Sequence, residues 1–432
     1  MNPPDASPPS APTRSRRRWL RLSLRGLMGL VLVFAAGLGY VVHLAHVQRE
    51  AVAAIRRTGG YASYGWHDLR ATDAYPTGEM TYFPPWMSDY LAPEVRERVL
   101  AWLGPDYFGA VSGVTLGEGD GFGGNNIGEA EMAHVARLRR LAVFWIGSPR
   151  LGKAEIKYLA GLTDLTEIVY MGTAADSDAS PADLSRLTKL RSLSLNVPTL
   201  VDADLAALRN LANLKHPSIV GPLLTDAGLA HLRGLVGLKE LRIVNTPITT
   251  AGLAHLRTLR NLRSIALSSN RVADLGPLAD LPGLEELELY DNPVTAAGLA
   301  PLSRMGHLDA LTLRRCGVTT AGLAALSGAA GLHKVDLVWC NLSGVRLEAL
   351  AKLPHLATLN LYETGITDAD LATLGLAPSL RNLTLRGNDI TDAGIDCLER
   401  STSLTYLDIF QNKVTAARAA RLRRTHPGLN IR

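Results

Sequence analysis

Residues 356–388 read LATLNLYETGITDADLATLGLAPSLRNLTLRGN, which is one complete unit of a pattern followed by the start of the next. In the first unit Leu356, Leu359 and Leu361 alternate with other residues, as in a short strand that buries one face. Thr367 then supplies an oxygen cap for a helix that begins just before the next apolar pair. The stretch therefore predicts one strand and one helix per unit.

The leucine that opens each unit returns at a nearly constant interval. The step is 24 residues each time, apart from one step of 22. A period in this range, with a strand and a helix or turn in every repeat, is typical of a curved solenoid. The opening leucines are Leu238, Leu262, Leu284, Leu308, Leu332, Leu356, Leu380 and Leu404.

We place the solenoid at residues 111–432, with some irregular repeats. The early repeats are spaced 27 and then 25 residues apart before the period settles at 24. The repeat at 262–280 contains RVADLGPLADLPGL and predicts a shorter link without a full helix. Pro217 stands where the second strand leucine belongs, and because proline cannot donate to a β-ladder we expect a local break in strand pairing there. Leu429 and Ile431 close the stack with half a repeat.

The N-terminal segment has the features of a membrane anchor. Residues 1–25 are rich in proline, serine and arginine and predict a basic, disordered cytoplasmic tail. Gly26 to Val47 (residues 26–47) carry no charged side chain and are long enough to form a transmembrane signal anchor. The preceding arginines predict that the N-terminus stays in the cytoplasm and that the rest of the chain is exported. Two alternatives are a cleaved signal peptide, which lacks a clean A-x-A site here, and a twin-arginine signal at 15–20.

Residues 48–110 do not repeat and predict a cap, because a solenoid leaves the apolar end of its first repeat exposed. We expect helices at Glu50–Arg57 and Pro93–Gly104, with a strand at Tyr61–Trp66 between them. An alternative role for the aromatic residues around Trp86 is to bind a glycan or a small molecule.

The basic balance of the chain does not indicate a nucleic-acid partner. The formal net charge is +5, but residues 1–58 hold nine arginines against two acidic residues. The remaining residues carry 36 basic and 38 acidic side chains. A nucleic-acid-binding protein carries its basic patch on the folded domain. We therefore expect no nucleic-acid partner.

Three cysteines are too few for a disulfide framework. Cys316 and Cys340 occupy a position that follows each strand, where a small polar or thiol side chain satisfies backbone groups of the turn. A disulfide between them is the alternative, since adjacent rungs lie about 4.8 Å apart, but parallel side chains fit its torsion poorly. The same position is held in other repeats by Asn270, Asn292, Thr364, Asn388 and Asn412.

Other motifs carry only weak signals for chemistry. The GDGFGG stretch at 119–124 has phosphate-binding spacing, but a repeat follows it, so we interpret it as a turn. Its neighbours Asp120 and Glu129 offer oxygens to calcium without the EF-hand order. His231 and His255 occupy equivalent positions of neighbouring repeats, without a third metal ligand. With no catalytic motif in the sequence, we expect no enzyme activity, no cofactor and no metal.

On these repeats, the region 111–432 resembles leucine-rich-repeat proteins of the ribonuclease-inhibitor-like and bacterial T-D-A-G-L type. The shorter repeat at 262–280 resembles the internalin type, and the basic and apolar N-terminus resembles the anchor of bacterial membrane-bound repeat proteins. The resemblance implies an α/β solenoid shaped as a curved horseshoe, with parallel strands on its concave face and short helices or turns on its convex face. It also implies a function in binding other proteins rather than catalysis.

The strand positions that point away from the core define a candidate partner-binding face. Several are residue types that dominate binding hot spots, although tyrosine and phenylalanine also favour strands for their own sake. Trp339 lies just beyond the edge of its strand. The candidate residues are Arg242, Glu288, Tyr290, Arg314, Asp336, Trp339, Asn360, Tyr362, Arg386, Asp408 and Phe410.

The sequence therefore predicts a single-pass membrane protein that presents its repeats outside the cytoplasmic membrane and binds a protein partner through the concave face. One alternative is a structural scaffold of the cell envelope with no specific ligand. Another is a glycan or small-molecule sensor that uses the aromatic residues of the cap.

Overall fold

The computed structural model describes residues 24–64, 110–116, 127–147, 156–172, 181–399 and 401–432. The chain forms two compact units, Met1–Val47 and Gln48–Arg432. The predicted helix at Pro93–Gly104, the aromatic cluster around Trp86 and the glycine-rich stretch at 119–124 lie outside the described residues.

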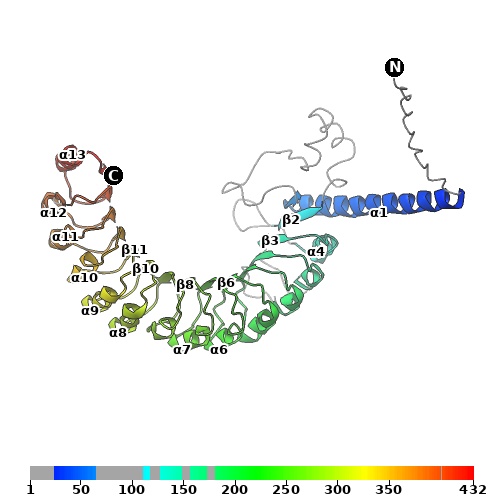
Figure 1. The fold of residues 1–432 in the computed structure, drawn as a ribbon, viewed down its shortest axis with the longest axis horizontal. Helices are drawn as coiled ribbons and strands as arrows, with labels where there is room; N and C mark the ends of the chain where they lie inside the picture. The colour runs from blue at the N-terminus through cyan, green and yellow to red at the C-terminus, as the bar shows by residue number, and fades with distance from the viewer. Residues whose placement is uncertain (1–23, 65–109, 117–126, 148–155, 173–180, 400) are drawn as a thin grey trace, which may run out of the picture. The chain divides into compact units, whose positions relative to one another are not determined.

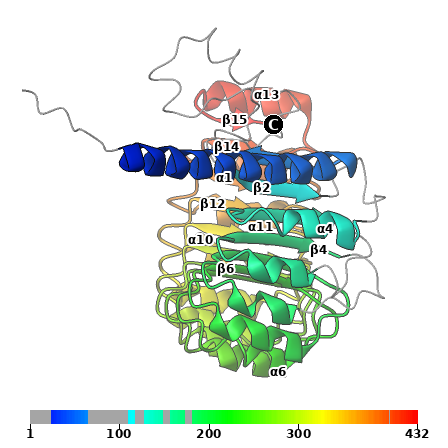
Figure 2. The same cartoon turned by 90° about the vertical axis from the view of Figure 1, so that its right-hand side faces the viewer.

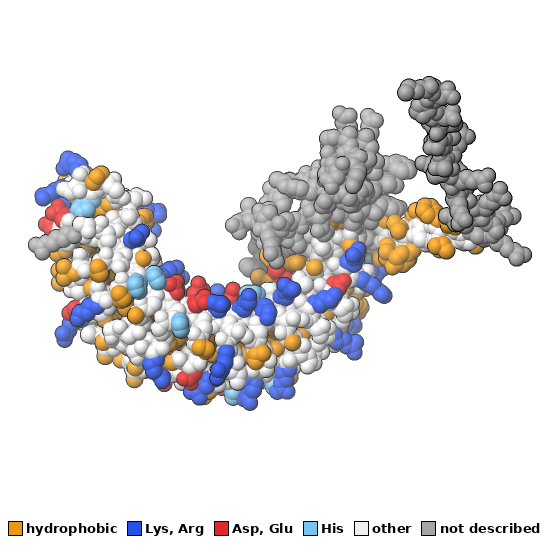
Figure 3. Space-filling model, viewed as in Figure 1, with side chains coloured by type: hydrophobic (Ala, Val, Ile, Leu, Met, Phe, Trp, Pro, Cys, Tyr) orange, Lys and Arg blue, Asp and Glu red, His pale blue; other side chains and the backbone are white. Residues whose placement is uncertain are grey.

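Helix α1 (Leu24–Arg57) is one continuous helix of 34 residues. The predicted helix at Glu50–Arg57 is confirmed, but it continues the preceding helix without a break, because no glycine or proline interrupts the sequence between Tyr40 and Thr58. Met28–Arg57 is long and apolar enough to cross a membrane, a test that a signal sequence near the N-terminus also passes. The apolar side chains between Met28 and Leu44 are exposed, as the orange surface of this helix in Figure 3 shows.

The strands of the second unit form one sheet of 15 strands in chain order. β1 is antiparallel to β2, and every later strand among the described residues pairs in parallel with its neighbour. The strands line the inner side of a curved stack of rungs (Figures 1 and 2). Their bounds are β1 Tyr61–Tyr64, β2 Val111–Leu116, β3 Val143–Gly147, β4 Glu167–Met171, β5 Ser192–Asn196, β6 His216–Val220, β7 Glu240–Val244, β8 Ser264–Ser268, β9 Glu286–Tyr290, β10 Ala310–Arg314, β11 Lys334–Asp336, β12 Thr358–Asn360, β13 Asn382–Thr384, β14 Tyr406–Asp408 and β15 Asn430–Ile431.

Short helices follow the strands on the outer side of the stack (Figure 1). The α-helices are α4 Glu129–Val135, α6 Asp226–Leu229, α7 Thr250–Leu253, α8 Ala296–Leu299, α9 Thr320–Ala324, α10 Glu348–Ala351, α11 Asp368–Leu374, α12 Asp392–Leu398 and α13 Ala416–Thr425. The 3₁₀ helices are η2 Lys157–Gly161, η3 Pro181–Arg186, η4 Asp202–Asn210, η5 Ala254–Leu256, η6 Gly276–Leu278, η7 Ala300–Arg304 and η8 Ala325–Gly328.

The core is a continuous column of leucines between the strands and the helices. Leu359 of β12 lies opposite Leu383 of β13, and both are fully buried. Each buried leucine contributes about 2 kcal/mol of transfer free energy. Because every repeat buries its apolar face only against its neighbours, stability accumulates along the stack.

The structure tests two predicted irregularities of the repeats, a missing helix and a break in strand pairing. The short repeat has only the 3₁₀ helix η6 where its neighbours have α-helices, as its sequence predicts. Pro217 does not break β6, because the strand keeps all five pairs with β5 from Ser192–His216 onward. Its effect is confined to the other side, where pairing with β7 begins only at Ser218.

The end of α1 and β1 cover the first rung of the repeats. Ala51 and Ile55 are fully buried, and the Gln48 side-chain oxygen accepts the backbone N–H of Val111 at 3.0 Å. A Cβ atom at Gly60 would lie 2.7 Å from the Thr115 carbonyl oxygen, so the chain needs glycine at this turn.

A turn with two fixed features ends each strand from β7 to β14. The first residue after the outward strand position has a left-handed backbone, with φ between 50° and 57° in seven non-glycine residues and 69° at Gly387. The next side chain then points into the stack. At Asn388, the side-chain oxygen lies 3.0 Å from the Thr364 amide nitrogen and 2.9 Å from that of Gly365. Its nitrogen lies 2.7 Å from the carbonyl oxygens of Leu361 and Leu385.

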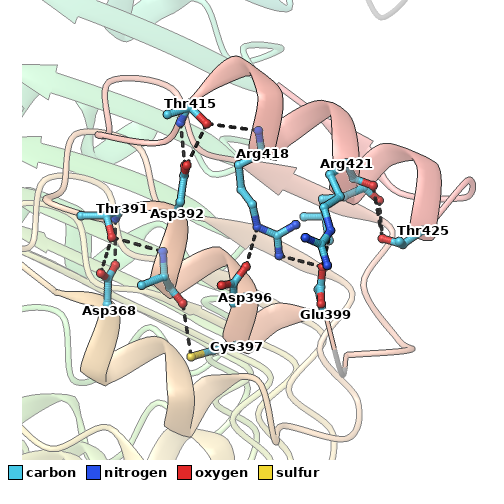
Figure 4. A network of polar contacts seen from close by, with 12 residues as sticks. Asp368, Thr391, Asp392, Asp396, Cys397, Glu399, Thr415, Arg418, Arg421 and Thr425 are labelled. Carbon is cyan, nitrogen blue, oxygen red and sulfur yellow. Dashed lines mark hydrogen bonds and ion pairs between the residues drawn. The ribbon is translucent and has the colours of Figure 1, made fainter.

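An aspartate–threonine contact joins the starts of neighbouring outer helices. Asp368 accepts the backbone N–H of Thr391 at 2.8 Å and its hydroxyl at 2.6 Å (Figure 4). A Cβ atom at Gly394 would lie 2.3 Å from the same carboxylate. The glycine of one T-D-A-G-L motif is therefore required by the aspartate of the repeat before it. Asp226 makes the same contact with the following repeat.

The last repeat replaces that glycine with Arg418, which is only 7% exposed. Its guanidinium reaches back to α12, 2.6 Å from Asp396 and 2.8 Å from Glu399 (Figure 4). A buried charge destabilises the folded state unless groups of opposite charge lie close to it. The buried arginine therefore ties α13 to the preceding repeat and covers the end of the core.

We predict that Asn388→Ala destabilises the protein by at least about 2 kcal/mol, because it leaves several buried backbone groups without a partner. The thermal unfolding midpoint of the full chain in detergent measures this. Asn382→Ala is the matched control, since the Asn382 amide makes a single 3.2 Å bond to the Thr358 hydroxyl. Equal midpoints for the two variants would contradict the role of the inward turn position.

The Asp392 carboxylate should make stability depend on pH. The backbone N–H and then the hydroxyl of Thr415 hold its pKa below the usual 3.8. A lowered folded-state pKa means that the stabilisation is present above 3.8 and is lost as pH falls through the folded value. The loss in unfolding midpoint caused by Asp392→Asn should therefore shrink between about pH 6 and pH 3. A loss that stays constant over this range would show that the contact carries no proton linkage.

Candidate binding site on the strand face

The outward side chains of β9 to β14 form one connected surface on the inner side of the stack. Trp339 is 39% exposed and Phe410 is 51% exposed, while Tyr290 and Tyr362 are partly exposed. Parallel strands in register bring equivalent positions of successive repeats side by side. Figure 3 shows charged side chains of both signs along this inner edge.

The first part of this surface is an arginine between two aromatic rings. The guanidinium carbon of Arg315 lies 5.7 Å from the ring centre of Tyr290 and 5.1 Å from that of Trp339. The three residues come from three successive repeats, with Arg315 in the middle one. Each such contact contributes about 0.5–1 kcal/mol at an exposed site.

The second part repeats the arrangement three rungs further on. The Arg386 guanidinium carbon lies 5.5 Å from the ring centre of Tyr362 and 4.9 Å from that of Phe410. Trp339 and Tyr362 join the two parts, with ring centres 5.9 Å apart. We name these six residues, Tyr290, Arg315, Trp339, Tyr362, Arg386 and Phe410, the aromatic–arginine column.

Glu363 fixes the middle of the aromatic–arginine column. Its carboxylate accepts the Trp339 indole N–H at 3.2 Å. It also raises the pKa of Tyr362, chiefly by accepting a hydrogen bond from the phenol. Gln411 plays a similar part for the second arginine, because its side-chain oxygen accepts the Nε–H of Arg386 at 3.0 Å. The rings and guanidinium groups are thus held in place before any partner arrives.

The predicted site residues Asp336 and Asp408 are covered rather than exposed. Asp336 is only 5% exposed, and its carboxylate lies 3.2 Å from Arg314 and 3.4 Å from the Asn360 amide. Asp408 is 6% exposed and accepts the backbone N–H of Phe410 at 3.0 Å. These two aspartates point out of the core as expected, but their neighbours cover them. They therefore orient neighbouring groups of the surface and are not themselves available to a partner.

Two predicted residues lie apart from the aromatic–arginine column. Glu288 is on β9, opposite Thr312, and Arg242 is on β7, opposite Ala266. No side-chain contact joins either of them to the column among the residues that the structure describes. They extend the same strand face toward the N-terminal repeats.

Sequence reasoning missed Arg315, Glu363 and Gln411. It took the two outward positions of each strand and treated Trp339 as an isolated residue beyond the edge. The structure shows that this next residue has the left-handed backbone in every repeat from β7 to β14. The signal was present, since the same position holds Asn245, Asp291 and Gly387, which are residue types that favour this conformation.

The cysteines have a structural role. Cys316 and Cys340 are free and buried, and the Cys340 thiol lies 3.1 Å from the Leu313 carbonyl oxygen. Burial raises the pKa of Cys340 to about 12, which keeps it a protonated thiol. The structure thus confirms the inward turn position and excludes the disulfide alternative in this state.

Histidines and open hollows also occur on the described part of the stack. Within the described ranges, no group of three His, Cys, Asp or Glu side chains is placed to hold a metal. His255 contacts Arg233 at 3.0 Å, while burial lowers the pKa of His231. An open hollow of about 500 Å³ next to His231 is lined by Arg209, Ala230, His231, Arg233 and Gly234. A smaller one of about 320 Å³ borders the aromatic–arginine column at Glu363 and Gln411.

Comparisons with known proteins agree with this architecture. A family model described as Leucine Rich repeat matches residues 377–398. An internalin (InlF) from Listeria monocytogenes superposes with a TM-score of 0.53 and 22% identity, covering 82% of this chain and 98% of that chain. The chain is a leucine-rich-repeat protein.

Other comparisons add little beyond the fold. A leucine-rich-repeat protein of Leptospira interrogans gives a TM-score of 0.48 at 16% identity, covering 69% of this chain and 86% of that chain. No characterised protein matches by sequence comparison. The leucine-rich-repeat fold is typical of proteins that bind other proteins, and the N-terminal apolar helix is consistent with a signal anchor or a signal peptide.

Proposed function

We propose that this leucine-rich-repeat protein recognises a protein partner through its concave strand face and has no catalytic activity. The aromatic–arginine column is the observation that supports this proposal most directly. It combines tyrosine, tryptophan and arginine, the residue types that dominate binding hot spots. It also exposes large aromatic surface on a rigid sheet, which is typical of an interaction site.

The fixed geometry of the aromatic–arginine column favours binding. Side chains that lose freedom on association cost about 0.5–1.5 kcal/mol each. Here Glu363 and Gln411 already hold Trp339 and Arg386. A partner therefore meets a preorganised surface and does not have to order these side chains.

We further propose that α1 anchors the protein in the cytoplasmic membrane and that the repeats lie outside it. The exposed apolar side chains of α1 include Val33 at 75% and Phe34 at 72%, which water does not favour. The arginines before α1 support an N-terminus in the cytoplasm. The final turns of α1 belong to the repeat unit and close its first rung.

Photo-crosslinking tests the binding face. A photoreactive phenylalanine analogue in place of Tyr362 should give a discrete partner adduct in native membranes. Adding Tyr290→Ala and Phe410→Ala should reduce its yield at least about tenfold, because hot-spot truncations cost about 2 kcal/mol. The control carries the analogue in place of Leu376, which is 72% exposed after α11, and should give no such adduct. Adducts of equal yield at both positions would argue against a concave binding site.

Protease accessibility tests the location. In intact spheroplasts, added protease should degrade the repeats, because the positive-inside rule places them outside. A cytoplasmic marker protein should stay intact in the same sample. Digestion of the repeats only after lysis would place them in the cytoplasm and contradict the proposal.

A further inference from the structure

We infer that the aromatic–arginine column binds an extended acidic segment of the partner protein, with two carboxylates four residues apart and an apolar side chain midway between them. The inference rests on the concave-face function proposed above and adds the chemistry of the segment that is bound. It rests on two arginines whose guanidinium N–H groups make few hydrogen bonds within the described residues.

Arg315 and Arg386 have no acidic partner among the described residues of the repeats. Arg315 is exposed, and within the described part of the chain its guanidinium makes ring contacts but no ion pair or hydrogen bond. Arg386 uses only its Nε–H, on the neutral side chain of Gln411. Arg314, in contrast, is paired with Asp336 at 3.2 Å. The column therefore carries two uncompensated cations.

The stacking prepares both guanidinium groups for carboxylates. Each guanidinium carbon lies 4.9–5.7 Å from two aromatic ring centres, and most of its N–H donors make no hydrogen bond within the described residues. A guanidinium edge matches a carboxylate through two parallel N–H···O bonds. The rings also restrict the side-chain rotamers, which lowers the entropic cost of forming these bonds.

The distance between the two arginines sets the spacing of the ligand's acids. Arg315 follows β10 and Arg386 follows β13, three rungs apart. At about 4.8 Å per rung this is roughly 14 Å. An extended chain advances about 3.3 Å per residue, so four residues span roughly 13 Å. Side chains four residues apart also point to the same face of an extended segment.

The middle of the column and its N-terminal side define the rest of the segment. Trp339 and Tyr362 lie between the two arginines, so the residue midway between the acids meets two rings. Glu363 is bonded to both of them and contributes to their orientation. Beyond Arg315, the strand β9 carries Glu286 and Glu288, which repel further acidic residues. The two acids of the proposed ligand therefore lie opposite Arg315 and Arg386, on either side of Glu363.

Fluorescence anisotropy with designed peptides tests the inference on the full chain in detergent micelles. The probe is a fluorescein-labelled peptide with the core Asp-Ser-Leu-Ser-Asp in a glycine–serine context. A second peptide of the same composition places the aspartates three residues apart, and a third has asparagine in both positions. The first should bind at least about tenfold more tightly than the others, because only it can pair a carboxylate with each of the two arginines at once. Equal binding of the three peptides, or no binding of the first, would overturn the inference.

Arginine variants assign the effect to the aromatic–arginine column. Arg315→Gln and Arg386→Gln should each weaken the first peptide about tenfold, while Arg424→Gln, at an exposed position of α13, should not. Arg386→Lys keeps the charge without the planar fork and should recover only part of the binding. Unchanged thermal midpoints would show that each variant is folded. If the glutamine variants keep the crosslink from the Tyr362 position at full yield, the concave face still binds a partner but the acidic-segment inference is wrong.

Discussion

The left-handed residue that ends each strand from β7 to β14 is the constraint on which these repeats depend. Leucine burial drives folding but has no direction, so by itself it does not fix the repeat length. The left-handed backbone reverses the chain and turns the next side chain inward, where Asn388 and its equivalents satisfy the peptide groups of the turn. Buried peptide groups without partners would cost about 1–3 kcal/mol each. Hydrogen bonding in the turn thus fixes where each strand ends, and the leucines fill the core of the repeat.

Contacts between repeats explain why residues of the consensus occur together. The carboxylate of Asp368 occupies the space that a side chain at position 394 would need, so this aspartate is paired with glycine in the next repeat. Asp392 makes the same contact with Thr415 although Arg418 holds the glycine position there. Where the next repeat lacks that threonine, Thr250 takes the place of the aspartate and accepts the Asp274 amide N–H at 3.0 Å. At the end of the stack Arg418 replaces the glycine and pairs with acidic residues of α12. Each exception therefore follows from what the neighbouring repeat offers.

The sequence predicted the stack well and the candidate site only in part. The periodic leucines predicted the position of every strand from β7 to β14, because burial on one face requires apolar residues at a fixed period. Alternation also identified Tyr290, Tyr362, Arg386 and Phe410 as outward residues. It did not reveal that Asp336 and Asp408 are covered, because their cover comes from adjacent repeats. The contribution of Arg315 was hidden for a similar reason, since only the turn brings that residue between two rings.

The identity of the residues at the left-handed position separates folding from function. A non-glycine residue in this conformation costs about 1–2 kcal/mol, and glycine or asparagine avoids much of this cost. Gly387 and Asn245 follow that rule, but Arg315 and Trp339 do not. Their side chains are exposed and bury little surface in the core, so the gain to folding is small. Ser269, Glu363 and Gln411 hold the same conformation without being glycine or asparagine, so its cost belongs to the turn and to folding. Only the exposed side chains that the turn presents, such as Arg315 and Trp339 with 5.1 Å between guanidinium carbon and ring centre, are available for recognition.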